Sequence, residues 1–160
     1  MQTIPLEVFE KNWRIIDQMA DEELELLIND MGEEQPTMLT YLLNVGEDSF
    51  NQDERETLFF LGVVIWKTMR DYGIVPLVTE TVIDSVENLN MEMLSYLEGE
   101  PEENFMSTVS MIMESYSQSE MLVFVATMLV DEAKENPGLR SDNLGIIMTY
   151  LKITIDCFNI

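Results

Sequence analysis

The sequence contains no histidine, and this absence excludes much of the chemistry that proteins perform near neutral pH. The chain lacks the base of Ser-His-Asp and Cys-His catalytic systems and any His-based proton transfer. It also lacks the His ligands of zinc sites and of Glu-x-x-His di-iron bundles. We therefore expect no enzyme of these classes and no cofactor, and the sequence predicts a protein that acts without catalysis.

Cysteine is nearly as scarce, because Cys157 is the only one. No disulfide can form within the chain, and no Cys-based zinc or iron–sulfur site can be built. The residue lies in the apolar stretch 154–158 and follows Asp156, whose charge disfavours a thiolate. We expect a buried, unreactive thiol.

Long hydrophobic runs are absent. The longest, 58–66 and 121–130, are too short to cross a bilayer. The N-terminal residues show no basic region followed by an apolar stretch, as a signal peptide would have. We expect a cytoplasmic protein with no membrane contact.

Basic residues are few: 8 Lys and Arg stand against 31 Asp and Glu, which gives a formal net charge of −23. No Lys or Arg occurs between Asp71 and Asp131. Affinity for nucleic acid depends on cations that meet phosphates, so we expect no direct nucleic-acid binding. The acidic surface either keeps the protein soluble or steers it towards a basic partner.

The 46% of apolar residues is ordinary for a folded protein, and 160 residues fit one domain. The seven glycines and five prolines are scattered, so neither a glycine-rich phosphate loop nor a flexible linker is present. Apolar residues recur with helical spacing, as at Leu6, Phe9, Trp13 and Ile16. Similar patterns predict further helices over 21–31, 36–45, 51–71, 76–88, 89–97, 101–113, 118–136 and 141–158, of which 89–97 either continues the helix before it or stands alone.

Capping boxes mark two helix starts. In this motif a polar side chain accepts a hydrogen bond from the backbone three residues on, and a Glu there reaches back to the cap. Asn51 and Glu54 have this spacing, and so do Ser117 and Glu120. The sequence predicts that both pairs begin helices in the same way.

The chain also repeats itself. The segment 4–6 (Ile-Pro-Leu) returns as 75–77 (Val-Pro-Leu), and the acidic segment 48–54 is echoed by 114–120. Both acidic segments lead into strongly apolar helices. These echoes predict a duplicated helical unit, because stacked helical repeats share one core.

We therefore expect an all-α fold: a single domain of eight to nine helices made of two similar units, either a bundle or a short superhelix. The units span about 4–73 and 75–138, with a terminal capping helix at about 141–158. The apolar helices 51–71 and 118–136 are hydrophobic almost all round. They are predicted to pack against each other at the centre.

The segment 48–54 resembles the acidic loop and helix of the tellurite-resistance TerB-like domains, which are also acidic, duplicated and all-helical. Asp48 and Glu54 match in the first copy, and Glu114 and Glu120 match in the second. The Asp-Gly step of that family is replaced by Ser at position 49 and again at 115. The chain is therefore not predicted to be a member.

Carboxylates provide one enzymatic alternative, a Mg²⁺-dependent hydrolase, because acids at helical spacing on facing helices can share a cation. The pairs are Glu7 with Glu10, Glu100 with Glu103, and Glu132 with Glu135. Such spacings arise readily in an acid-rich chain. We interpret them as solvated helix faces.

The candidate binding residues lie in two equivalent loops between helices, at 32–36 and 99–103. Each combines a glycine, acids and a proline, and if the two copies lie side by side the loops form one acidic edge. The residues predicted to contact a partner are Glu33, Glu34, Glu100, Glu102 and Glu103.

The sequence thus predicts a non-catalytic helical interaction module that binds a basic protein, steered by charge and held by apolar contacts. An immunity or inhibitor protein, or a DNA mimic, directed against a nucleic-acid-binding protein is the first alternative. The Mg²⁺-dependent hydrolase is the second. The oligomeric state does not follow from the sequence.

Overall fold

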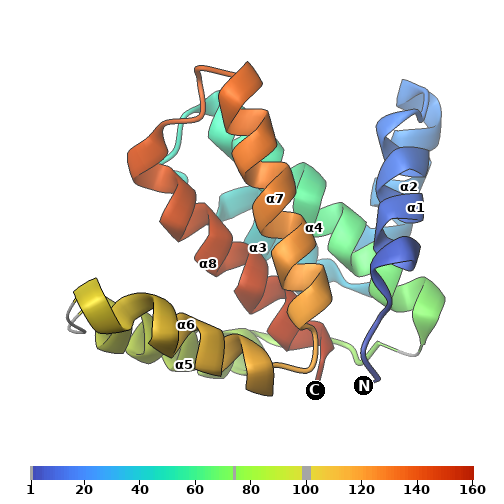
Figure 1. The fold of residues 1–160 in the computed structure, drawn as a ribbon. Coiled ribbons are helices and arrows are strands. Elements are labelled where there is room, and N and C mark those ends of the chain that lie inside the picture. The colour runs from blue at the N-terminus through green and yellow to red at the C-terminus, as the bar shows by residue number, and fades with distance from the viewer. Residues whose placement is uncertain (1, 74, 99–101) are drawn as a thin grey trace.

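The computed structural model of this chain describes residues 2–73, 75–98 and 102–160, and within them it forms eight α-helices and no strand. The prediction of an all-α fold is confirmed. Figure 1 shows the arrangement of the helices. In chain order they are α1 (Leu6–Asp17), α2 (Asp21–Glu34), α3 (Pro36–Asn44), α4 (Gln52–Tyr72), α5 (Glu80–Glu98), α6 (Glu102–Ser115), α7 (Ser119–Glu135) and α8 (Ser141–Phe158).

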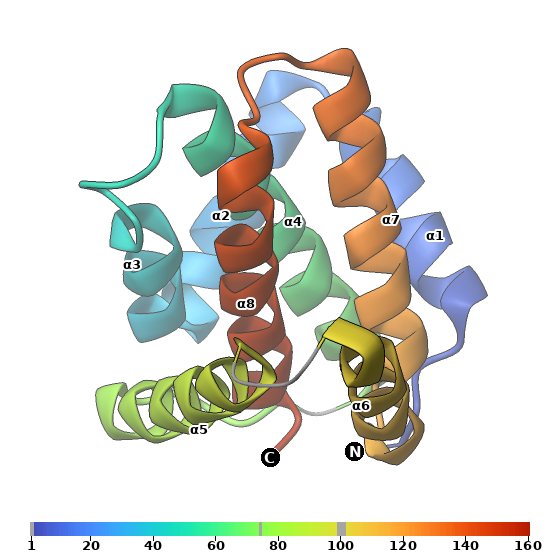
Figure 2. The same ribbon diagram turned by 60° about the vertical axis from the view of Figure 1, so that its left-hand side comes forward.

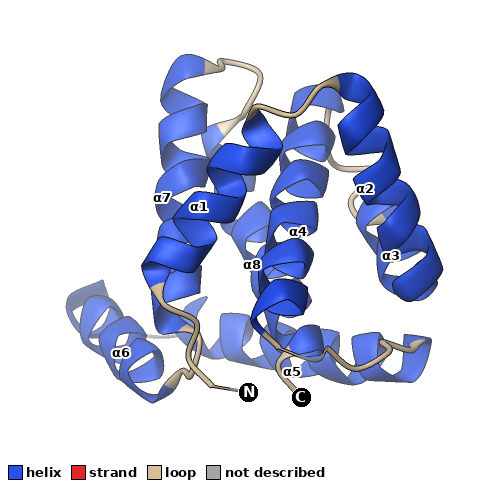
Figure 3. Ribbon diagram, turned by 90° about the vertical axis from the view of Figure 1, so that its right-hand side faces the viewer, coloured by secondary structure: helices blue, strands red, loops and turns tan. Residues whose placement is uncertain are grey.

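Helices α4 and α8 form the centre of the fold (Figures 1 and 3). Helices α1, α2 and α3 pack on α4, whereas α5 and α7 pack on α8. Every residue of α4 from Leu61 to Trp66 is buried, and so are most residues of α8 from Leu151 to Phe158. Burial of large apolar side chains on both helices stabilises this pair, because each contributes roughly 1.5–3 kcal/mol.

Helices α5 and α6 lie across one end of the molecule, roughly perpendicular to α4, α7 and α8 (Figures 1 and 2). Both ends of the chain lie at this same end (Figure 3). Within the described ranges, no helix combines the length and apolarity that a bilayer span requires.

The prediction that 51–71 and 118–136 pack against each other is wrong. In the structure, α8 is the main partner of α4, and α7 packs on α8 and α1 instead. Helix α7 is apolar on more than its buried face, since Val123 and Val130 are 54% and 45% exposed. Helix α8, which the sequence assigned to a terminal cap, occupies the central position.

The start and length of the fifth helix also differ from the expectation. Residues 75–79 are not helical, and α5 begins at Glu80 and runs without a break to Glu98. Of the two sequence alternatives for 89–97, the continuous helix is therefore correct. The two-unit repeat stays a prediction.

Two buried glutamines bind the non-helical segments 2–5 and 75–79, which contain the prolines of the repeated motif. Gln35, just before α3, donates to the carbonyl of Pro76 (2.8 Å) and accepts from the Val78 amide (3.0 Å). Gln118, just before α7, binds residues 2 and 4 in the same pattern, at 2.9 and 3.1 Å. Each side-chain amide thus binds one backbone carbonyl and one backbone amide of a segment that belongs to neither a helix nor a sheet.

The two predicted capping boxes have different outcomes. The Asn51 side chain accepts from the Glu54 amide (2.9 Å) and Glu54 accepts from the Asn51 amide (3.1 Å), so this box is confirmed. The box at Ser117 is wrong, because α7 begins at Ser119 and has no side-chain cap. Glu120 instead accepts from the amide of Leu6 at the start of α1, at 3.0 Å.

Substitutions at the two predicted cap positions are expected to lower the stability of the protein by different amounts. Asn51→Ala removes the cap and the hydrogen bond to the Gly138 carbonyl (2.7 Å), and should lower the free energy of unfolding by about 1–2 kcal/mol. Ser117→Ala removes only an exposed acceptor of Asn159, so its cost should be about 0.5 kcal/mol or less. Urea denaturation measures both values, and equal losses would contradict the structural assignment.

Candidate functional site

A pocket of about 250 Å³ opens between α1, α4 and α7. Each of these helices contributes an apolar residue and, one turn away, an acidic residue. The lining residues, called the acidic pocket below, are Trp13 and Asp17 of α1, Asp53, Glu56, Thr57, Phe60 and Leu61 of α4, Met128 and Glu132 of α7, and Asn136.

The direction of the helices places the acids together. Helices α1 and α7 run one way and α4 runs the other (Figures 1 and 2). Trp13 precedes Asp17 by four residues, whereas on α4 the acid Glu56 precedes Phe60 by four. The i and i+4 positions share a helix face, so the aromatic rings lie at one end of the pocket and the carboxylates at the other.

The four pocket acids are not neutralised by the protein. Asp17, Asp53, Glu56 and Glu132 are all exposed, and none forms an ion pair with a Lys or Arg in the part of the chain that the structure describes. Glu56 accepts one hydrogen bond, from Gln52 of its own helix at 2.6 Å. The pocket therefore combines an apolar end with an end of uncompensated negative charge.

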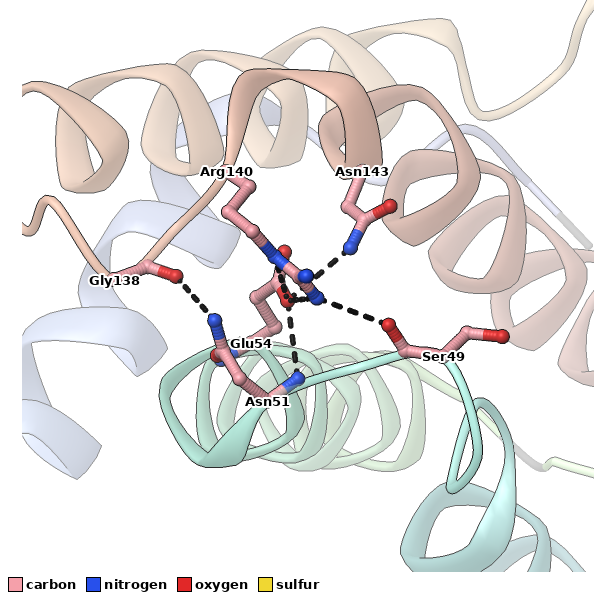
Figure 4. A network of polar contacts seen from close by, with 6 residues as sticks. All are labelled: Ser49, Asn51, Glu54, Gly138, Arg140 and Asn143. Carbon is pink, nitrogen blue, oxygen red and sulfur yellow. Dashed lines mark hydrogen bonds and ion pairs between the residues drawn. The ribbon is translucent and has the colours of Figure 1, made fainter.

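A network centred on Glu54 fixes the α4 side of the acidic pocket (Figure 4). The Glu54 side chain is fully buried, and its Oε1 atom accepts from Nη2 and Nε of Arg140 at 2.6 and 3.1 Å. The same oxygen accepts from the Asn143 side chain (3.2 Å) and the Asn51 amide (3.1 Å). The start of α4 is thereby joined to the start of α8.

The loop between α7 and α8 is held by the same network. Arg140 donates to the Ser49 carbonyl (3.0 Å), and Asn51 donates to the Gly138 carbonyl (2.7 Å), as Figure 4 shows. Gly138 lets the Asp53 carboxylate approach the loop backbone, since a Cβ at this position would collide with that carboxylate. The positions of Asp53 and Asn136 in the acidic pocket depend on this close packing.

The charge state of Glu54 follows from its contacts. Burial alone raises the pKa of the carboxyl group, but hydrogen bonds from Arg140, Asn51 and Asn143 outweigh burial and hold the pKa below its ordinary value. The hydrogen bond to Glu54 in turn raises the pKa of Arg140. Glu54 is therefore ionised at neutral pH, and one of the eight cations of the chain neutralises it.

The predicted partner-binding residues are only partly placed by the structure. Glu33 and Glu34 are exposed and end α2 rather than standing in a loop, and Glu34 accepts from Arg70 at 3.1 Å. Glu100 lies outside the described residues, and so do the side chains of Glu102 and Glu103. The shared acidic edge stays a prediction.

The acidic pocket was not predicted from the sequence, since its residues come from three helices whose mutual packing was not foreseen. The signal in the sequence is an apolar residue four positions from an acid on each helix. The buried thiol was foreseen: Cys157 is fully buried, and burial, with the charges of Asp156 and Glu87, raises its pKa to about 12.

Replacement of Glu54 tests the network. Because the folded-state pKa is lowered, the contribution of the carboxylate is complete above its unfolded pKa of about 4.3 and is lost as pH falls through the folded value. Glu54→Gln should lower the free energy of unfolding by about 1–3 kcal/mol at pH 7. The difference from wild type should shrink below pH of about 4.

Denaturation at a series of pH values measures this difference. The exposed neighbour Glu56 provides the control, since Glu56→Gln should change stability by no more than about 0.5 kcal/mol. A difference for Glu54→Gln that stays constant through the acid range would show that the ionised form is not the stabilising one.

Comparison with known proteins gives no relative from which a function can be transferred: no family model, no curated protein and no solved structure matches this chain.

Proposed function

We propose that this chain is a non-catalytic, acidic helical module that binds a basic protein, and that the acidic pocket receives a Lys or Arg side chain of that partner. The observation that carries the proposal is the pocket itself, in which aromatic and thioether groups at one end adjoin unneutralised carboxylates at the other. The apolar groups of the pocket match the apolar stem of a Lys or Arg side chain, and the carboxylates match its charged head.

The chemistry of the pocket favours arginine. A guanidinium group stacks on aromatic faces such as those of Trp13 and Phe60, and it donates in a fixed fork that suits carboxylates. The volume of about 250 Å³ is below the range of roughly 300–1,000 Å³ that is typical of pockets for small-molecule ligands. A single inserted side chain suits a hollow of this size.

The net charge of −23 supports the same proposal on a larger scale. A field of one sign accelerates association with a partner of the opposite sign and disfavours partners of the same sign. An inhibitor of a basic nuclease or a DNA mimic is a particular case, because each opposes a protein that presents Lys and Arg.

The rival Mg²⁺-dependent hydrolase requires acids from different helices to converge on one cation. Among the residues that the structure describes, no three of Asp, Glu and Cys are placed to hold a metal ion. The carboxylates of the acidic pocket instead lie at one end of a hollow whose other end is apolar. This geometry supports recognition of an organic cation.

The two tryptophans of the chain permit a direct test. Trp13 is half-buried in the acidic pocket, whereas Trp66 is fully buried in the core. Titration with Nα-acetyl-arginine amide should shift the indole N–H resonance of Trp13 and leave that of Trp66 unchanged. The citrulline analogue has a similar shape without the charge, and it should produce little shift.

Neutralisation of the pocket acids should weaken this binding. The quadruple variant Asp17→Asn, Asp53→Asn, Glu56→Gln and Glu132→Gln is expected to bind acetyl-arginine amide at least about fourfold more weakly, since each of the four exposed charges contributes about 0.2–1 kcal/mol. The control carries the same charge change on exposed acids of α2, at Asp21, Glu22, Glu25 and Asp30. Equal weakening in both variants, or equal binding of citrulline, would refute the pocket as the recognition site.

A further inference from the structure

A second hollow, of about 380 Å³, lies at the other end of α7, where α5 and α6 cross the bundle (Figures 1 and 2). Its wall is made mostly of methionine and aliphatic side chains. The residues, called the apolar groove below, are Asn90, Met93 and Leu94 of α5, Ile112 and Met113 of α6, Leu122, Val123 and Ala126 of α7, and Met148, Thr149 and Lys152 of α8.

The apolar groove continues along α5. An adjoining hollow of about 360 Å³ shares Asn90, Met93 and Lys152 with it and extends to Val86 and Leu89. From residue 86 to residue 94 a helix rises about 12 Å, a little more than two turns. The combined depression therefore has the length over which a docked helix places apolar side chains at i, i+3 or i+4, and i+7.

Among the described residues of the wall, Lys152 is the only cation, and it is already engaged. Lys152 donates to Asp156 (2.6 Å) and to Asn90 (2.9 Å), and its ammonium group lies 4.8 Å from the ring centroid of Tyr116. Asp156 neutralises its charge. An anionic head group, such as that of a fatty acid, therefore finds no free cation in this wall.

The charges next to the apolar groove select its occupant. Exposed Glu92 and Glu114 are adjacent in sequence to the lining residues Met93 and Met113. No Lys or Arg occurs on α5, on α6 or on the part of α7 that lines the groove. Anionic lipids, acidic peptides and a second copy of this chain, with its charge of −23, are all repelled, whereas a cationic surface is attracted.

We propose that the apolar groove binds an amphipathic helix of the basic partner, with the apolar face of that helix on the methionines and its Lys and Arg residues towards the flanking acids. The inference rests on the proposed function insofar as the partner is basic. Flexible methionine side chains adapt to partner side chains of different shape, so the groove is expected to tolerate Leu, Ile or Phe on the bound helix.

The test uses a synthetic 18-residue helix with Leu on one face and Lys on the other, labelled with fluorescein and followed by fluorescence anisotropy. A second peptide has the same composition in an order that forms no apolar face. A third has Glu in place of Lys. The first should bind, the second should bind at least about tenfold more weakly because one or two anchoring side chains are lost, and the third should not bind.

Two matched variants locate the site on the protein. Val123 lines the apolar groove, and 54% of its surface is exposed. Val130 lies two turns further along α7 and does not line the groove, and 45% of its surface is exposed. Val123→Glu should weaken binding of the Leu/Lys peptide about tenfold, because a charge replaces an apolar contact. Val130→Glu adds the same charge to the same helix and should leave binding unchanged or slightly tighter.

A third variant tests whether binding depends on the shape of the groove. Ala126→Leu narrows the groove without adding a charge and should also weaken the peptide complex, while circular dichroism confirms that each variant retains its helices. If both Glu variants bind as tightly as wild type, the peptide is held by charge alone and the groove proposal is wrong.

Other occupants give distinct results. If sodium laurate stabilises the protein and the Leu/Lys peptide does not bind, the apolar groove is a lipid site. If sedimentation equilibrium shows a dimer that Val123→Glu dissociates, the occupant is a second copy. Either result overturns the proposal. The titration of Trp13 with acetyl-arginine amide is independent of this groove, so failure here and failure of the proposed function are distinguishable.

Discussion

Burial of α4 against α8 is the interaction on which the other helices depend. Helix α4 carries α1, α2 and α3, and helix α8 carries α5 and α7. The residues 61–66 of α4 are buried on every side, which requires neighbours all round and leaves no free face for solvent. The Glu54 network ties the start of α4 to the start of α8, so the same pair of helices also positions the wall of the acidic pocket.

The distribution of the few cations explains where the negative charge remains unneutralised. Arg140 is bound to Glu54, Lys152 to Asp156, and Arg70 to Glu34. These cations join helices or neutralise acids: no Lys or Arg is among the described residues that line the acidic pocket, and Lys152, which lines the apolar groove, is neutralised by Asp156. Both proposed sites thus combine apolar surface with nearby acids, which is the arrangement that a cationic, partly apolar partner requires.

Helical content, most helix ends and the Asn51 cap were predictable because they depend on neighbours within a few residues. Which helices pack against each other was not predictable, because the apolar content of a helix does not identify its neighbours in the fold. Helix α8 was assigned to a terminal cap because it follows the two proposed units, and its place at the end of the chain does not reveal that it packs on α4, α5 and α7. The Ser117 box failed because Gln118 and Glu120 bind backbone 114 residues away, a contact that local spacing does not reveal.

The central position of α8 has a consequence for synthesis. Helix α4 emerges from the ribosome long before its main partner exists, so the side of residues 61–66 that packs on α8 stays uncovered while some seventy further residues are translated, about 4–14 s at 5–20 residues per second. During that interval the nascent chain offers a hydrophobic surface to chaperones and to other nascent chains. The excess of acidic residues in the chain, 31 against 8 basic ones, then repels identical nascent chains on a polysome and reduces their aggregation.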